Sequence, residues 1–298
     1  MSSIVWLASY PKSGSTWIRI LLSNYLRDAD EPADINALGG RLGHAAARVL
    51  FDEWVGVEAS ALEQPVIDRL RPEVYRSLAR EAPETLYLKV HDAWTLNDRD
   101  RALFPADATA GVVYVVRNPL DTAASCAHHW GVGVERAVER MCDPSHSISN
   151  SLMRLDDQLR QFLGSWSDHV QSWLDDSGLP CHVVRYEDLR QDAERAFGAV
   201  VRFCGLPDDA ARVRKAVEFS DLTELRRQER ENGFRERSPS THGGFFRRGE
   251  VGSWHDELPL TLARRLAEVH RETMSRLGYL DETSETEVSS GSVLAGRA

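Results

Sequence analysis

Four short runs of apolar residues stand at widely spaced positions in the chain. They cover residues 4–10, 85–90, 111–116 and 181–186, and each is rich in β-branched and aromatic side chains. Near-continuous apolar character of this kind is typical of strands buried on both faces, as in a parallel sheet covered by helices. The pattern therefore predicts four buried strands.

Segments between these runs repeat apolar residues at helical spacing instead. The first follows the opening run and contains Trp17, Ile18, Ile20, Leu21, Leu22, Tyr25 and Leu26. The second contains Leu152, Leu155, Leu159, Phe162, Leu163 and Trp166. Strands that alternate with helices need crossover connections, so we predict an α/β protein with a central, mostly parallel sheet flanked by helices.

Three segments show neither pattern. Residues 28–64 carry turn formers and mixed polarity, and we expect them to be an insertion that shapes a substrate pocket. Residues 231–249, ENGFRERSPSTHGGFFRRG, are expected to form a long loop, which in a compact domain is usually functional or disordered. Residues 281–298 are poor in large apolar residues and rich in serine and glutamate, so a disordered tail is predicted there.

Composition narrows the class of protein. The 298 residues are 42% hydrophobic and 28% charged, with a formal net charge of -10. A net negative surface repels nucleic acids and anionic membranes, so neither is an expected partner. The sequence shows no secretory signal and no apolar run near the roughly 20 residues that span a bilayer, so a cytoplasmic location is expected. The four cysteines form no CxxC pair, which favours reduced thiols over a disulfide framework or zinc site.

Polar side chains directly follow each predicted strand. They are Lys12, His91, Arg117 and Tyr186. Ligands of an open parallel sheet bind at the carboxyl ends of its strands, where the connecting loops meet. We therefore expect these four side chains to share one site, in which two cations are available for an anion.

The first strand end, YPKSGSTW, has the composition of an anion-binding turn. Residues 13–16 offer backbone N–H groups and hydroxyls at the start of a helix, and Lys12 supplies a positive charge. Capping of that helix by Ser13 or Ser15 is an equally good interpretation of the turn alone. The Walker A pattern GxxxxGK[ST] does not occur in the chain, which counts against an ATP-dependent small-molecule kinase.

A second anion site is predicted from the stretches RNPLDTAAS and RRGEVGSW. Arg117 leaves the third strand, and Ser125 lies two turns along the helix that Pro119 opens. Arginine offers a bidentate fork for phosphate, and serine adds a hydroxyl donor. Arg247 and Arg248 bring further charge beside glycines that let the backbone approach a phosphate closely.

The motifs YPKSGSTW, RNPLDTAAS, RYEDL and RRGEVGSW together resemble those of the cytosolic-type sulfotransferases, and they occur in the family's order. These enzymes take a sulfuryl group from 3′-phosphoadenosine 5′-phosphosulfate (PAPS) and release adenosine 3′,5′-bisphosphate (PAP). The resemblance begins at residue 4 and implies a single sulfotransferase domain over residues 1–280, with a P-loop-like α/β fold. The stretch HDAW is more similar to bacterial members than to animal ones.

The resemblance also implies roles for individual residues. It places the 5′-phosphosulfate on Lys12, Ser13, Gly14, Ser15 and Thr16. It places the adenine and the 3′-phosphate near Trp17, Arg117, Ser125, Tyr186, Leu222, Arg247, Arg248 and Gly249. The implied catalytic residues are His91 as the base, Lys12 at the leaving oxygen and Lys89 near the transferred group.

A mechanism without a metal follows from these roles. An acceptor hydroxyl attacks sulfur in line while the 5′-phosphate leaves, so positioning and electrostatics dominate. An imidazole with a reference pKa near 6.5 suits base work at neutral pH, although a single histidine at a strand end is also a common structural residue. The pair His128-His129 lacks nearby ligands at metal-binding spacing, so no metal site is predicted.

The chain departs from the family at three points. Residues 252–256 read GSWHD where the family commonly has GDWKN, so roles for Ser253 and His255 are not assigned. Leu222 stands where a phenylalanine often flanks the adenine. The dimer signature of many animal members is not evident, so no oligomeric state is predicted.

The acceptor is expected to be a small molecule with a hydroxyl group. Its pocket is predicted to draw on residues 28–64, 92–104, 126–165 and the segment 231–249, which should order when the donor binds. The aromatic side chains of Trp54, Trp94, Trp130 and Phe245 suggest a flat acceptor such as a phenol. The alternative is that these side chains belong to the core. A lipid, a glycan or a natural-product intermediate are alternative acceptors, and a PAP-binding protein without catalysis is an alternative function.

Overall fold

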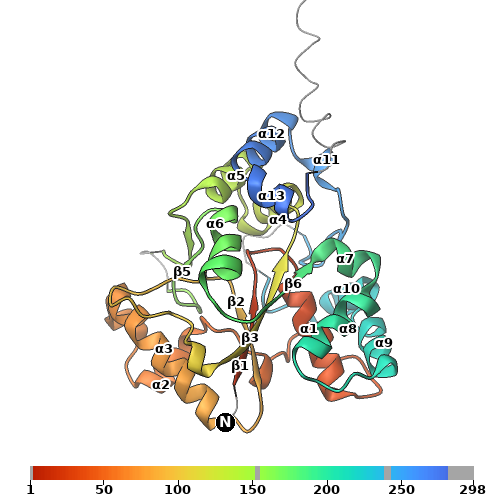
Figure 1. Ribbon diagram of the computed structural model, residues 1–298. Coiled ribbons are helices and arrows are strands. Elements are labelled where there is room, and N and C mark those ends of the chain that lie inside the picture. The colour runs from red at the N-terminus through yellow and green to blue at the C-terminus, as the bar shows by residue number, and fades with distance from the viewer. Residues whose placement is uncertain (1–2, 152–154, 238–242, 281–298) are drawn as a thin grey trace, which may run out of the picture.

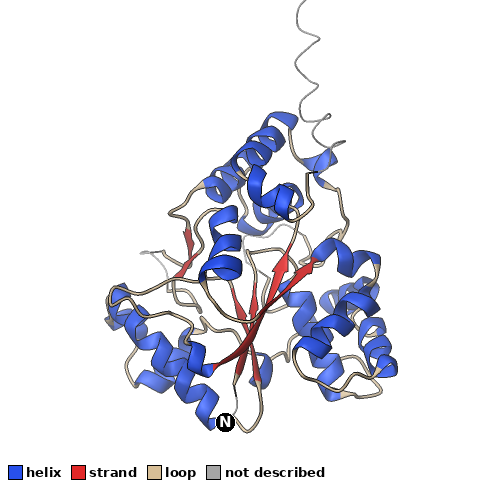
Figure 2. Ribbon diagram, viewed as in Figure 1, coloured by secondary structure: helices blue, strands red, loops and turns tan. Residues whose placement is uncertain are grey.

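A computed structural model of the chain describes residues 3–151, 155–237 and 243–280. Its centre is a sheet of four parallel strands in the order β2-β1-β3-β6 (Figures 1 and 2). The strands are β1 (Ile4–Ala8), β2 (Leu86–Val90), β3 (Thr109–Val116) and β6 (Cys181–Arg185). Each predicted apolar run forms one of these strands, so the predicted α/β sheet is confirmed.

The central strand β1 divides the apolar core into two parts. Its side chains alternate between the two faces of the sheet, as they must in any strand. Trp6 belongs to the core on one face, whereas Val5 and Leu7 belong to the core on the other. All five residues of β1 are buried, which explains why the sequence shows a continuous apolar run rather than an alternating one.

Helices cover both faces of the sheet (Figure 1). On one side lie α1 (Ser15–Arg27), α7 (Tyr186–Gln191), α8 (Ala193–Phe203), α9 (Ala210–Glu218) and α10 (Leu222–Asn232). The core of the other side is filled from α3 (Gln64–Glu81), α4 (Pro119–Trp130), α5 (Val134–Cys142), α6 (Trp166–Gln171), α12 (Leu260–Val269) and α13 (Arg271–Arg276). These layers make a single α/β domain.

Shorter elements complete the chain. They are α2 (Arg48–Val55), α11 (Trp254–Glu257), the 3₁₀ turns η1 (Gly40–Leu42), η2 (Ala59–Ala61) and η3 (Ala106–Ala108), the π-helical η4 (Ser172–Asp176), and the antiparallel pair β4 (Ser147–Ile148) and β5 (Gln161–Phe162). Within the described ranges, no helix combines the length and the apolar character that crossing a membrane requires.

The predicted helix over residues 152–166 is wrong in its described part, because residues 155–165 are extended or irregular. The backbone of this segment pairs with distant chain instead, and the Leu159 N–H donates to the Ala46 carbonyl at 2.8 Å. Leu159 and Leu163 fill two different apolar clusters. Their helical spacing therefore reflects two separate burials and not one helix face.

Two further predicted segments have different outcomes. Residues 28–64 contain η1, α2 and η2, and α2 packs mainly against α3. The part before α2 packs elsewhere, since His44 pairs with Lys89 of β2 and Ile35 lies in a cluster with Ile20 of α1. The predicted disordered tail, residues 281–298, lies outside the described residues.

Candidate active site

A cavity of about 960 Å³ opens where the carboxyl ends of the parallel strands meet. The predicted site residues that line it are Lys12, Gly14, Ser15, Thr16, Trp17, Lys89, His91, Arg117, Ser125, Tyr186, Leu222, Arg247, Arg248 and Gly249. Ser13 is fully buried and does not line the cavity, and its hydroxyl has no hydrogen-bond partner within the described structure. The cavity thus brings together every predicted site residue except Ser13.

The turn between β1 and α1 has an unusual backbone. Lys12 and Gly14 have positive φ angles of 68° and 111°. The N-terminal capping position of α1 is Gly14, and no side chain caps the helix there. The alternative in which Ser13 or Ser15 caps α1 is therefore wrong, and the first N–H groups of the helix are available to an anion.

Tyr186 is the side chain around which the turn and two other segments are arranged. A Cβ atom at Gly14 would lie 2.8 Å from Tyr186 Cδ2, so only glycine lets the turn approach this ring. The Arg117 guanidinium lies over the same ring, 4.5 Å from its centroid. The Tyr186 hydroxyl donates to the Gly249 carbonyl at 3.1 Å. The two predicted anion seats therefore share one aromatic side chain.

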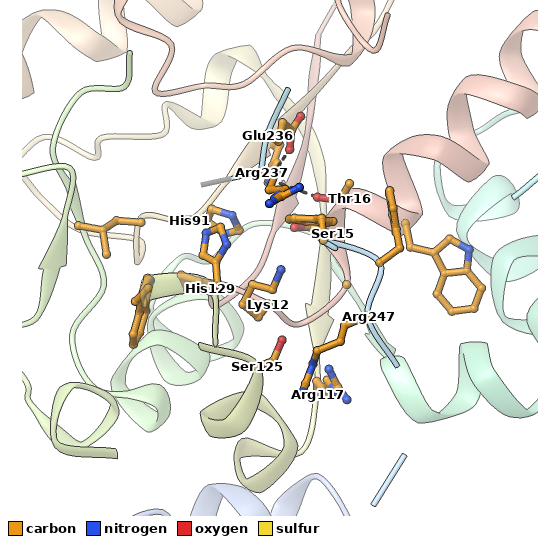
Figure 3. A pocket seen from close by; sticks show the side chains of 18 of the residues that line it. Lys12, Ser15, Thr16, His91, Arg117, Ser125, His129, Glu236, Arg237 and Arg247 are labelled. Atoms are coloured by element: carbon orange, nitrogen blue, oxygen red, sulfur yellow. Dashed lines mark hydrogen bonds and ion pairs between the residues drawn. The ribbon is translucent and has the colours of Figure 1, made fainter. Parts of the chain in front are cut away.

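Lys12 lies in the middle of the labelled side chains in Figure 3. Its Nζ atom is 3.6 Å from the centroid of the Phe245 ring, a cation–π contact. Burial lowers the pKa of Lys12 to about 7, and the neighbouring cations Lys89 and Arg117 act in the same direction. An anion that entered the cavity would restore the charge of this lysine.

Arg117 and Asp121 join α4 to the segment before α11. Arg117 donates to the Glu250 carbonyl at 2.9 Å, and its guanidinium lies 3.9 Å from the Asp121 carboxylate. The buried Asp121 carboxylate accepts from the N–H groups of Gly252 and Trp254 at 2.9 and 3.0 Å. The aspartate thus holds the chain that follows the predicted phosphate-binding arginines.

The late loop, residues 243–249, presents its arginines beside the cavity. Arg247 is paired with Glu257 at 2.5 and 2.9 Å, and Arg248 lies 3.4 Å from Asp256. The Glu229 carboxylate of α10 accepts from two backbone N–H groups of this loop. Helix α10 therefore anchors the late loop, while acids of α11 hold its two arginines.

His91 follows β2 and is held in one tautomer. Its Nδ1 atom lies 2.8 Å from the Ser9 carbonyl oxygen, which can only accept, so Nδ1 carries the proton and Nε2 is unprotonated. Its own carbonyl accepts from Nε2 of His169 at 3.0 Å. Burial lowers the pKa of His91 well below its usual range, and Lys89 and His44 lower it further. The imidazole is therefore neutral and has a free nitrogen that can accept a proton, but its lowered pKa makes it a weaker base than the reference imidazole.

Lys89 is bound by a carboxylate that the sequence did not single out. Its Nζ atom lies 3.0 Å from Glu236 Oε2 and 3.4 Å from the Thr16 hydroxyl. Arg19 donates to the other oxygen of the same carboxylate. Figure 3 shows Glu236 near Thr16, on the side of the cavity away from Arg117. Burial alone would raise the pKa of Glu236, but the two cations hold it well below its usual range.

The lining that residues 130–158 contribute is mainly polar. Its polar lining residues are Arg136, Glu139, Arg140, Asp143, His146, Ser147, Ser149, Asn150, Asp156, Asp157 and Gln158. Trp130 and Ile148 are the larger apolar residues of this part of the lining, and Phe245 of the late loop lines the cavity beside Lys12. Residues from 126–165 and from the late loop thus line the cavity, and their part in an acceptor pocket stays a prediction.

Other predicted pocket residues lie elsewhere. No described residue of 28–64 or 92–104 lines this cavity, so Trp54 and Trp94 belong to the packing of the domain, as their alternative reading held. Helix α2 packs on α3, and the backbone near His44 pairs with Lys89 along the edge of β2 without reaching the cavity lining. His129 lines the cavity and His128 does not. Across the described ranges, no group of three or more potential metal ligands is found.

Residues 2–278 match the sulfotransferase domain model. The chain therefore belongs to the sulfotransferase family, and the enzyme class that this family defines is the PAPS-dependent sulfotransferases. The predicted family resemblance and the predicted sulfotransferase fold are thereby confirmed.

The chain is similar to individual members of this family. It is 24% identical to human sulfotransferase 2B1 over 91% of its own length and 66% of that protein, and 24% identical to the rat protein over 92% and 71%. Its fold is similar to that of mouse sulfotransferase SULT7A1 complexed with PAP, with a TM-score of 0.58, 18% identity and coverage of 95% of this chain and 87% of that one. It is also similar to the fold of retinol dehydratase in complex with androsterone and PAP, with a TM-score of 0.61 and 18% identity. That match covers 91% of this chain and 80% of the other.

Sequence reasoning missed the acidic and aromatic residues that complete the site. Glu236 and Phe246 line the cavity, and no role was predicted for either of them. Asp121 was predicted as a helix-start or salt-bridge residue, and it lies in the first turn of α4 beside Arg117. One signal for Glu236 exists in its partner. Arg19 is a charged residue within an otherwise uncharged helical stretch, TWIRILLSNYL, and such a residue needs a buried acid.

Proposed function

We propose that this chain transfers the sulfuryl group of PAPS to a hydroxyl group of a small-molecule acceptor, a phenol or an alcohol, with His91 as the base. The observation that carries the proposal is the tautomer of His91, in which Nε2 is unprotonated. The His91 ring lines the cavity, as does Lys89. Base catalysis needs such an unprotonated nitrogen. A structural histidine has one as well, so a measurement of transfer separates this function from PAP binding without catalysis.

The two predicted anion seats support PAPS as the donor. The turn of residues 12–16 offers uncapped N–H groups, two hydroxyls and Lys12 to the 5′-phosphosulfate. Arg117, Ser125 and the late-loop arginines Arg247 and Arg248 line the cavity where the 3′-phosphate would bind. The adenine would lie near Trp17, whose indole N–H donates to the Ser220 carbonyl at 2.9 Å and so is fixed in place.

The reaction follows from charges on these side chains. The acceptor oxygen forms a bond to sulfur while the bond from sulfur to the 5′-phosphate oxygen breaks, and the hydroxyl proton passes to Nε2 of His91. Lys12 stabilises the charge that grows on the leaving phosphate, and Lys89 does so for the sulfuryl oxygens. The donor carries its own leaving group, and fixed cations neutralise it, so the scheme contains no metal.

The lining of the acceptor end bears on the choice of acceptor. Polar side chains outnumber the apolar ones there, and Arg140 lies over the Trp130 ring, 5.3 Å from its centroid. Buried polar groups lose hydrogen bonds to water when a purely apolar molecule covers them, which disfavours such an acceptor. An alcohol with further polar groups therefore fits this end better than a plain phenol, and a glycan-like acceptor stays among the candidates.

Transfer of labelled sulfuryl from PAPS to a panel of hydroxyl acceptors tests the proposal directly. Replacing the base, His91→Ala, should leave PAP affinity largely intact while transfer falls by about 10²- to 10⁴-fold. An undiminished rate would remove His91 from the mechanism. PAP binding by the unaltered protein without transfer to any acceptor would favour the non-catalytic alternative.

A further inference from the structure

Glu236 brings a half-buried carboxylate, whose side chain is 29% exposed, to the part of the cavity where the sulfuryl group is proposed to react. Its two oxygens are shared between Lys89, at 3.0 Å, and Arg19. The two cationic residues are only 7% and 3% exposed. Charges this far from water need a counter-charge, and Glu236 supplies it to both at once.

The position of this carboxylate is fixed from both sides. Arg19 lies on α1, one turn after Thr16, and its remaining donors bind the carbonyls of Leu38 and Leu42 at 2.8 to 3.0 Å. Lys89 also reaches the Thr16 hydroxyl at 3.4 Å. A continuous chain of contacts therefore runs from Arg19 through Glu236 and Lys89 to the anion-binding turn.

We propose that Glu236 is a positioning residue for Lys89 and determines the charge of the subsite that receives the sulfuryl group. The inference rests on the proposed function, because it needs PAPS in the cavity. Arg19, Lys89 and Glu236 together carry one net positive charge. The sulfuryl group of PAPS carries a single negative charge, whereas a terminal phosphate carries about -1.5 to -2 at neutral pH.

This charge balance makes Glu236 a specificity-determining residue for the donor. A single net cation matches a sulfate end, and a carboxylate at its side repels the second charge of a phosphate end. The subsite would therefore reject the phosphate analogue of PAPS, adenosine 3′-phosphate 5′-diphosphate, although the two molecules have almost the same shape. PAP lacks the terminal group altogether, so its binding should not depend on Glu236.

The same carboxylate affects how Lys89 titrates. Lys89 interacts electrostatically with six charged or titratable groups, which are Arg19, Lys12, His44, His91, His129 and Glu236. Glu236 is the one acid among these described groups. Burial lowers the pKa of Lys89, and Glu236 opposes that effect. Removing the carboxylate should therefore let Lys89 lose its proton at a lower pH.

The test compares Glu236→Gln with a matched control, Glu231→Gln, which removes an exposed carboxylate of the same segment that is paired with Arg227. For each protein, affinities for PAP, PAPS and the 5′-diphosphate analogue are measured by calorimetry, and the transfer rate is measured against pH. In Glu236→Gln the preference for PAPS over the diphosphate should fall by about tenfold. The alkaline limb of its rate profile should move to lower pH, with PAP affinity retained.

Three outcomes decide between the inferences. The first is a Glu236→Gln protein that binds PAP and keeps both its donor preference and its pH profile unchanged. This result would overturn the role of Glu236. If that variant does not fold, Glu236→Asp replaces it. Because aspartate keeps the charge, donor preference should persist while transfer slows. Loss of the donor preference in Glu236→Asp would count against the inference. If the unaltered protein binds PAPS but transfers nothing, the proposed function fails, and the binding preference still tests Glu236.

Discussion

Lys12 Nζ lies 3.6 Å from the centroid of the Phe245 ring, so an aromatic side chain of the late loop covers the cation of the opening turn. The contact joins two segments that are far apart in sequence at the point where the leaving phosphate is proposed to bind. The ring covers one side of the ammonium group, and burial is the main cause of the low pKa of Lys12.

Binding of PAP should therefore be coupled to proton uptake by Lys12. The pKa of this lysine is about 7 in the free protein, and a phosphate beside it raises that pKa. PAP affinity should be constant below about pH 7 and fall at higher pH, until the pKa of the complex is passed. Calorimetric titration at pH 8, in buffers with different ionisation enthalpies, measures the number of protons taken up.

Lys12→Arg is the control for this coupling. Arginine stays charged at every accessible pH, so the variant should bind PAP without taking up a proton from the buffer at this position. Proton uptake in Lys12→Arg equal to that of the unaltered protein would assign the coupling to another group.

Gly14→Ala should damage both stability and donor binding. The added Cβ would lie 2.8 Å from Tyr186 Cδ2, and the φ angle of 111° is one that alanine rarely adopts. We expect a loss of about 1–3 kcal/mol in the free energy of unfolding and at least a tenfold loss of PAP affinity. Urea denaturation and calorimetry measure the two quantities.

Gly56→Ala is the matched substitution for that test. Gly56 also has a positive φ angle, 74°, but a Cβ there would meet nothing within 4 Å. The Gly56→Ala variant should lose about 1 kcal/mol in the free energy of unfolding, from backbone strain alone, and should bind PAP with unchanged affinity. Equal PAP affinities in the two variants would show that the contact between Gly14 and Tyr186 does not shape the site.

Asp121→Asn should loosen the chain that follows the late loop. The buried carboxylate accepts from two backbone N–H groups and lies near Arg117, and an amide cannot serve all of these donors. We expect a loss of about 1–3 kcal/mol of stability and weaker PAP binding. Asp107→Asn, which alters an exposed pair with Arg76, should change stability by about 0.5 kcal/mol or less. Similar losses in both variants would contradict the assigned role.

Hydrogen exchange should show whether the segment 231–249 responds to the donor. A 3′-phosphate competes with Glu257 and Asp256 for Arg247 and Arg248, so the contacts of the late loop must change when PAP binds. Peptides from this segment should gain protection in the presence of PAP. Unchanged protection, measured at saturating PAP, would show that the segment does not respond to the donor.

The sequence predicted the strands and the turn between β1 and α1 correctly, because these elements depend on residues that are neighbours in the chain. The strands were visible because each is buried on both faces, and the YPKSGSTW turn was visible because its glycine and lysine lie next to the helix they serve. The segment 155–165 was misjudged because its backbone pairs with distant chain near Ala46. Glu236 was missed because it acts on Arg19, 217 residues earlier in the sequence. Such pairs are created only by the fold.

The Tyr186 ring also has a consequence for which nucleotides the cavity accepts. Gly14 lies against the edge of the ring, Arg117 lies over its face and the Gly249 carbonyl binds its hydroxyl. The separation between the opening turn and Arg117 is thus determined by one planar group that contacts both. A spacer of constant width suits one distance between phosphates, so isomers that carry the second phosphate at another ribose position should be excluded by length.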